Sequence, residues 1–132
     1  MSRENVALVQ RSIELWNRGD VDVYMALFAD DAEFVTDPQF LEGGTHKGRE
    51  AIAVFLRGLH EGWAPGDSVV PTDIRDAGDK VFLSWDWQAT GSASGLETSS
   101  HWNGVITFRG GEAIRFEIFA DRAGALAAAG LA

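Results

Sequence analysis

Hydrophobic residues in the first half of the chain recur at three- and four-residue spacing, which is typical of amphipathic helices. The spacing predicts helices over residues 3–18, 21–28 and 48–59. In the first of these, the apolar face is formed by Val6, Val9, Ile13 and Trp16. Each predicted helix therefore has one side that the rest of the chain must cover.

Apolar and polar residues alternate in the second half of the chain, which is the period of a half-buried strand. The predicted strands are 33–36, which precedes this half, and 68–76, 81–89, 97–108 and 113–120. Pro71 interrupts the second of these, which favours a sheet edge or a bulge. Glycine pairs at 43–44 and 110–111 indicate turns. A final alanine-rich helix over residues 122–129 follows Asp121, which can cap its first turn.

This order of elements predicts one α+β domain that spans residues 1–132. We expect a cone-shaped, curved antiparallel sheet with the three helices of the N-terminal half packed on its concave face, because each helix has one apolar side to bury. A chain of 132 residues is long enough for one core, and it contains no linker, repeat or charge block. The helices and the sheet are expected to enclose an apolar cavity.

Composition limits the classes of partner. The chain has 20 acidic and 11 basic residues, which disfavours binding to nucleic acid or to an anionic membrane, because Lys and Arg carry both interactions. No apolar run approaches the roughly 20 residues that span a bilayer, and the N-terminus lacks the apolar segment of a signal peptide. We therefore expect a cytoplasmic protein. With no Cys and three scattered His, neither a metal nor another cofactor is expected.

Five short segments stand out by their order and spacing. They are WNRGD at 16–20, LFADDA at 27–32, Asp37-Pro38, GREAI at 48–52, and the ending from Phe119. Together they resemble the SnoaL-like family of the nuclear-transport-factor-2-like superfamily, which contains relatives of ketosteroid isomerase and of polyketide cyclases. The likeness covers nearly the whole chain. It implies the conical α+β fold, but it leaves function open, because this fold carries isomerases, cyclases, dehydratases, hydrolases and non-catalytic modules.

Asp37 is the first candidate for catalysis. It follows a predicted strand that Pro38 ends, so it is expected at the mouth of the cavity. A carboxylate among apolar side chains is a stronger base than one in water, and it could remove a proton from a bound molecule. The resemblance implies the same role, because Asp37 occupies the position of the general base in ketosteroid isomerase. The alternative is that Asp37 only hydrogen-bonds the nearby backbone.

The partners of this carboxylate differ from those of the isomerase. The resemblance places Ile13 and Gly104 where the isomerase has its two hydrogen-bond donors to the substrate oxygen, and neither side chain can donate. His46, which is expected in a loop before the third helix, could supply an acid at the cavity mouth. A solvated loop histidine is the alternative.

Aromatic residues on the inward faces of the predicted elements could form a wall for a small apolar or polycyclic molecule. The residues expected to contact such a molecule are Ile13, Trp16, Tyr24, Phe34, Phe55, Trp85, Trp87, Trp102, Gly104, Phe116 and Ile118. Core filling is the alternative for each of the tryptophans. On the outer face of the sheet, Phe82 and Phe119 suggest a sheet-to-sheet homodimer, which the resemblance also implies.

Four further residues are interpreted as having surface or structural roles. His60 is expected at a helix end and His101 on the outer sheet face, where surface roles are the default. Asp121 and Arg122 are explained by a helix cap and an ion pair.

The preferred hypothesis is a cofactor-independent enzyme in which Asp37 removes a proton next to a carbonyl, in an isomerisation, cyclisation or dehydration. One alternative is a non-catalytic ligand-binding or assembly module of the same fold. A further alternative is an epoxide hydrolase, which would need a second carboxylate and an arginine at the cavity.

Overall fold

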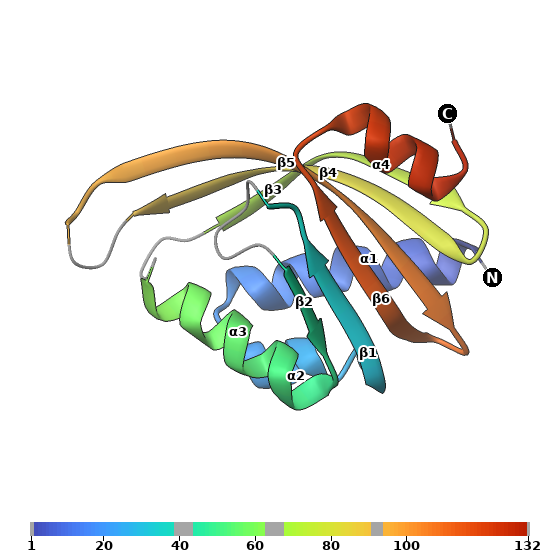
Figure 1. The fold of residues 1–132 in the computed structure, drawn as a ribbon, viewed down its shortest axis with the longest axis horizontal. Helices are drawn as coiled ribbons and strands as arrows, with labels where there is room; N and C mark the ends of the chain where they lie inside the picture. Colours follow the sequence, from blue (N-terminus) through green and yellow to red (C-terminus); the bar gives the residue numbers. More distant parts are fainter. Residues whose placement is uncertain (1, 39–43, 63–67, 91–93, 132) are drawn as a thin grey trace.

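A computed structural model describes residues 2–38, 44–62, 68–90 and 94–131. Its elements are α1 (Ser2–Asn17), α2 (Val21–Met25), β1 (Phe28–Thr36), β2 (Gly44–Lys47), α3 (Arg49–Gly62), β3 (Ser68–Ala77), β4 (Lys80–Thr90), β5 (Glu97–Arg109), β6 (Glu112–Phe119) and α4 (Arg122–Ala129). Figure 1 shows a strongly curved sheet with helices against it, so the predicted α+β cone is confirmed.

The strands form one sheet in the order β2-β1-β6-β5-β4-β3. Neighbouring strands are antiparallel except β1 and β6, which pair in parallel. The sequence predicted a purely antiparallel sheet. This was wrong, because the sheet is mixed. The parallel pair sets Phe34 beside Phe116, with ring centroids 5.0 Å apart, so aromatic packing supports it. β3 lies at one edge and its register shifts between Pro71 and Asp73, which confirms the prediction made from Pro71.

Two local predictions near β1 were wrong. The second helix was expected to reach Phe28, but α2 ends at Met25 and Phe28 begins β1 beside Ala113 of β6. Pairing with a strand distant in sequence overrides the short helical pattern. Gly44 was expected in a turn, but it begins β2, which pairs with β1; Gly43 lies outside the described residues.

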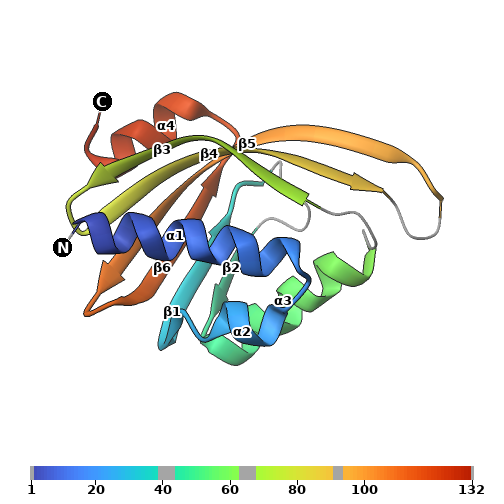
Figure 2. The ribbon, with the colours of Figure 1, turned by 180° about the vertical axis from the view of Figure 1, so that it is seen from behind.

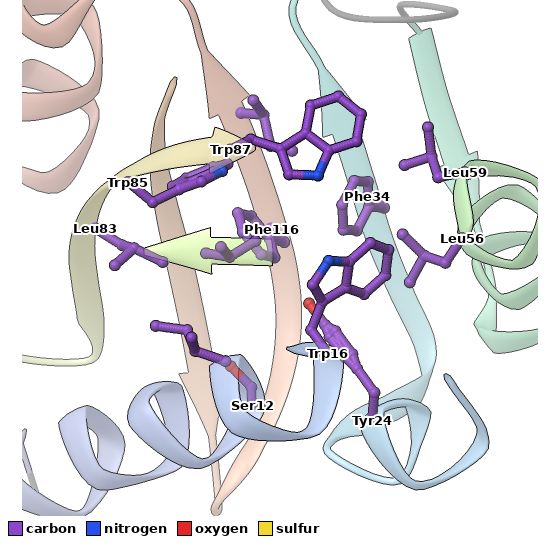
Figure 3. A pocket seen from close by; sticks show the side chains of 13 residues that line it. Ser12, Trp16, Tyr24, Phe34, Leu56, Leu59, Leu83, Trp85, Trp87 and Phe116 are labelled. Atoms are coloured by element: carbon purple, nitrogen blue, oxygen red, sulfur yellow. The ribbon is translucent and has the colours of Figure 1, made fainter. Parts of the chain in front are cut away.

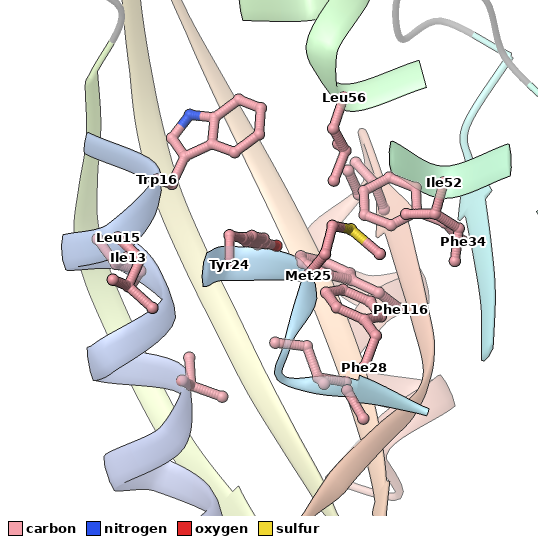
Figure 4. Packing of buried hydrophobic residues seen from close by; sticks show 14 of the residues in the cluster. Ile13, Leu15, Trp16, Tyr24, Met25, Phe28, Phe34, Ile52, Leu56 and Phe116 are labelled. Carbon is pink, nitrogen blue, oxygen red and sulfur yellow. The ribbon is translucent and has the colours of Figure 1, made fainter. Parts of the chain in front are cut away.

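The main core lies between the concave face of the sheet and the first three helices, as expected (Figures 1 and 2). Figure 4 shows how residues from α1, α2, α3 and the sheet meet there, with Ile52 and Phe28 almost fully buried. No helix in the described part of the chain is both long and apolar enough to cross a membrane.

The convex face carries a second, smaller core under α4 (Figure 1). Ala125 and Ala129 of this helix pack on Phe82 and Val105, which have no exposed surface. Phe82 is thus covered by the chain's own last helix and offers no contact to a second subunit. The homodimer through the outer face stays a prediction, which a molar mass from light scattering tests.

A buried polar network fixes the start of α4 over the sheet. Ser84, at 0 % exposure, donates from Oγ to Oδ1 of Asn103 at 2.7 Å, and it accepts from Arg122 Nη1 at 3.0 Å. The Arg122 guanidinium also lies 5.0 Å from the centre of the Phe82 ring. Asn103, expected on the outer face, is on that face but fully enclosed.

Candidate functional site

A cavity of about 70 Å³ lies between α1, α2, α3 and the concave face of the sheet (Figure 3). We call it the central cavity. The residues that line it are Ser12, Ile13, Trp16, Tyr24, Phe34, Leu56, Leu59, Val69, Leu83, Trp85, Trp87, Phe116 and Ile118.

The periodicity of the elements explains why these side chains converge. Alternation along β4 points Leu83, Trp85 and Trp87 to the same face, and Phe116 and Ile118 follow the same rule on β6. The side walls come from helices, with one turn of α1 and one of α3 facing each other across the space.

At the β3 edge of the sheet, the Asn17 side chain pairs with the backbone as a neighbouring strand would. Asn17, at the end of α1, donates from Nδ2 to the Val69 carbonyl at 2.9 Å and accepts from the Val69 N–H at 2.7 Å. This pair of hydrogen bonds satisfies the backbone of an edge strand and holds α1 against it. Val69 is thereby fixed in the cavity wall.

Gly104 creates room in the cavity floor without lining it. A Cβ at this position would stand 2.7 Å from Phe116 Cε1 and 3.0 Å from Trp85 Cζ3, which is closer than such atoms approach. The two rings, with centroids 6.2 Å apart, therefore occupy the space over the glycine. Gly104 was predicted as a contact residue; in the structure it lies beneath these two rings, and its lack of a side chain lets them approach the strand.

The lining of the central cavity is almost entirely apolar. Among the residues that the structure describes around it, none is a carboxylate, an imidazole, a lysine or an arginine. The polar atoms are the indole nitrogens, the Ser12 hydroxyl and the Tyr24 hydroxyl. Ser12 Oγ donates to the Val9 carbonyl at 2.6 Å, so its hydrogen is already used. Burial raises the pKa of the Tyr24 phenol above its usual value, which keeps it protonated.

Asp37 is not among the residues that line this cavity. It follows Thr36, whose register partner is the cavity residue Ile118, so it lies at the end of the cavity wall. Its Oδ2 accepts a hydrogen bond from the Ala120 N–H at 3.1 Å, between the ends of β6 and α4. This contact fits the structural alternative that the sequence left open for Asp37.

His46 belongs to β2 and not to a loop as predicted. Its ring stacks on Phe55, with centroids 4.2 Å apart and planes inclined by 20°. Phe55 in turn packs on Phe34, with centroids 5.8 Å apart, so His46 lies one layer behind the cavity wall. Its Nε2 is buried and has no hydrogen-bond partner in the described chain.

The sequence comparison with protein families matches residues 9–116 to the SnoaL-like domain. The chain belongs to the SnoaL-like family. A comparison with curated proteins finds no match.

Solved structures similar to this SnoaL-like protein support the same fold. A nuclear-transport-factor-2-like protein from Burkholderia thailandensis is 26% identical, covers 96% of this chain and 95% of its own, and has a TM-score of 0.76. A putative SnoaL-like polyketide cyclase from Jannaschia is 20% identical, with coverages of 99% and 94% and a TM-score of 0.79. TerC, co-crystallized with polyporic acid, is 22% identical, with coverages of 92% and 94% and a TM-score of 0.77.

Most of the residues predicted to contact a ligand do line the central cavity of this SnoaL-like protein. The exceptions are Gly104, Phe55 and Trp102. Trp102 lies opposite Trp85 at the margin of the core, and its indole donates to Ser100 Oγ at 2.8 Å. The residues that sequence reasoning missed are Ser12, Leu56, Leu59, Val69 and Leu83. Leu83 shares the face of Trp85 and could have been found from alternation, whereas the polar Ser12 gives no such signal.

The remaining candidates have structural partners. His101 Nδ1 lies 2.8 Å from Asp86 Oδ1 on the outer face, as expected for a surface role. Asp121 accepts from the N–H groups of Ala123 and Gly124, which confirms the predicted helix cap. The side chain of His60 lies outside the described part. Among the described residues there is no cluster of three or more His, Cys, Asp or Glu that could hold a metal ion.

Proposed function

We propose that this SnoaL-like protein binds a small, uncharged and largely apolar molecule in the central cavity. The observation that carries the proposal is the absence of any charged side chain among the described residues of the lining. A charged molecule in such a site would lose its hydration without gaining a counter-charge, which is strongly unfavourable. Ordinary ligand sites measure about 300–1,000 Å³, so a cavity of about 70 Å³ favours a compact molecule over a polycyclic one.

The structural neighbours support a binding role for this kind of fold. TerC was crystallized with polyporic acid, so a protein with a similar fold is found together with an organic molecule. At 22% identity this similarity concerns the fold alone. The size and polarity of the molecule bound here are therefore argued from the lining of its own cavity.

Blocking the cavity tests the proposal. Leu59 lines the cavity and is only partly buried, so Leu59→Trp should fill space there without opening the core. Val54 lies on the same helix and is 64% exposed, which makes Val54→Trp a matched control. Cyclohexanone binding, followed by the indole N–H signals in NMR spectra, should weaken at least about tenfold in Leu59→Trp only. Equal binding by both variants, or preferential binding of cyclohexylammonium or cyclohexanecarboxylate, would contradict the proposal.

A second candidate is proton abstraction by Asp37, which corresponds to the enzyme hypothesis from the sequence. The observation in its favour is the register of Thr36 with Ile118, which sets the next residue, Asp37, at the end of the cavity wall. In this reaction a proton on the carbon beside a carbonyl passes to the carboxylate and the electron pair forms the enolate. An exchanged solvent deuteron then returns to that carbon.

Hydrogen exchange measures this step directly. In D₂O the protein should catalyse exchange at the carbons next to the carbonyl of cyclohexanone, and Asp37→Asn should remove the catalysis while the melting temperature stays within about 2 °C. Equal exchange rates with and without wild-type protein would leave binding as the function. An epoxide hydrolase is not supported, because the described lining of the cavity contains neither of the carboxylate and arginine groups it would need.

A further inference from the structure

Tyr24 is the most enclosed hydroxyl-bearing side chain of the central cavity. It lies on α2, whose first turn is capped by Asp20, and it is only 6% exposed. Its ring is held edge-on by Trp16, with centroids 5.6 Å apart, and by Phe28, at 5.5 Å. These contacts fix the ring, and Figure 3 shows its oxygen directed into the cavity.

The Tyr24 hydroxyl faces the cavity and makes no hydrogen bond to any residue that the structure describes, although Tyr24 as a whole is only 6% exposed. Buried hydroxyl groups normally have partners, because a hydroxyl removed from water and left unpaired destabilises the fold. Ser12 offers the contrast within the same lining, because its hydrogen is committed to the Val9 carbonyl. Tyr24 therefore holds a fixed, unused O–H donor inside an apolar space.

We propose that Tyr24 is a ligand-binding residue that donates its hydrogen bond to an oxygen acceptor on the bound molecule. The inference rests on the proposed binding function and narrows its ligand to compact, uncharged molecules with one acceptor oxygen. Burial raises the pKa of the phenol, so Tyr24 remains a donor at physiological pH. Hydrocarbons of the same shape fit the space but leave the donor unpaired, which selects against them.

A matched pair of probes isolates this hydrogen bond. Cyclohexanone and methylenecyclohexane have nearly the same shape, and they differ by an oxygen in place of a methylene group. Both are titrated by NMR into wild-type protein, Tyr24→Phe and Ser99→Ala. Tyr24→Phe removes only the oxygen and keeps the ring packing, while Ser99→Ala removes an exposed hydroxyl on β5 that does not line the cavity.

For wild-type protein we expect cyclohexanone to bind more tightly than methylenecyclohexane. In a cavity without a donor, methylenecyclohexane should bind more tightly than cyclohexanone, because the ketone gives up hydrogen bonds to water on entering. Tyr24→Phe should weaken cyclohexanone about tenfold and leave methylenecyclohexane within about twofold, since a single hydrogen bond distinguishes the two probes. Ser99→Ala should leave both affinities within about twofold, because Ser99 lies outside the cavity. The wild-type preference is a readout that does not depend on how any variant folds.

The possible failures are distinguishable. If cyclohexanone binds wild type and Tyr24→Phe equally well, the hydroxyl serves only a bound water and the inference is overturned, while the proposed binding function stands. The same conclusion follows if both probes weaken equally in Tyr24→Phe. If neither probe shifts any signal of the wild-type protein, the proposed function fails and the inference fails with it.

Discussion

Arg122 donates a hydrogen bond of 2.6 Å from Nη2 to Oδ2 of Asp73, which ties the first residue of α4 to β3. The same guanidinium reaches Ser84 and lies over Phe82, so one side chain joins the last helix to two strands. The smaller core under α4 depends on this attachment.

Removing the side chain should loosen α4. We expect Arg122→Ala to lower the free energy of unfolding by about 1–3 kcal/mol, because it also leaves the buried Ser84 hydroxyl with one partner fewer. Arg109 makes an exposed pair with Asp31 at 3.4 Å, so Arg109→Ala is the control and should cost less than about 1 kcal/mol. Urea denaturation of both variants measures the difference. Equal losses would show that Arg122 contributes only as a surface charge.

The same contact predicts a dependence of stability on pH. The hydrogen bond from Arg122, with a smaller effect of Arg75, holds the pKa of Asp73 below its usual value. The folded protein thus binds a proton at Asp73 less readily than the unfolded chain, so the stabilisation is complete above about pH 4 and is lost as the pH falls further. Wild type should therefore be more stable than Asp73→Asn at pH 7, and the two should converge as the pH falls below about 4. A difference that stays constant from pH 7 into this acidic range, measured by urea denaturation, would contradict the assignment.

Filling the space over Gly104 should disturb the cavity floor. In Gly104→Ala the new methyl group meets Phe116 and Trp85 at the distances given above, so the rings must move, at a cost of about 1–3 kcal/mol. Gly58 lies within α3, and the position where its Cβ would stand is open space. Gly58→Ala should therefore be neutral or stabilising by up to about 1 kcal/mol. Chemical denaturation compares the two glycines. A stabilised Gly104→Ala would show that the rings adapt without strain.

Two substitutions separate the structural from the chemical role of Asp37. Asn keeps an oxygen that can accept from the Ala120 N–H, whereas Ala leaves that N–H without this partner. Asp37→Ala should therefore cost about 1–2 kcal/mol of stability and Asp37→Asn less than about 0.5 kcal/mol. Thermal unfolding measures both. If Asn is as damaging as Ala, the negative charge and not the hydrogen bond is what the fold requires.

The elements that could be predicted from the sequence are those fixed by interactions between residues close together in the chain. Alternation is local, so it found β4, β5 and β6, and with them the inward positions of Trp85, Trp87 and Phe116. β2 has only four residues and no alternation of its own, and it exists because β1 offers it a partner. The parallel pairing of β1 with β6 joins residues about eighty positions apart, which no local pattern records.

The candidate site was predictable where it is apolar and not where it is polar. A hydrophobic face identifies Trp16 and Ile118, because burial alone decides their orientation. The positions of Ser12 and Asp37 depend on hydrogen bonds to Val9 and Ala120, and such partners are visible only in three dimensions. For this reason the sequence favoured Asp37 as the centre of the site, whereas the residues that line the cavity include Tyr24 and not Asp37.

The pairing of β1 with β6 also determines when the full sheet can form during synthesis. During synthesis β1 and β2 emerge early, and β3, β4 and β5 follow as a separate set of neighbours. Only β6, next to the C-terminal helix, joins the two sets, so loop closure over most of the chain precedes the final sheet. The central cavity takes its walls from both sets and does not exist on a nascent chain that ends before β6. A compound that binds the cavity would therefore stabilise only chains long enough to include β6.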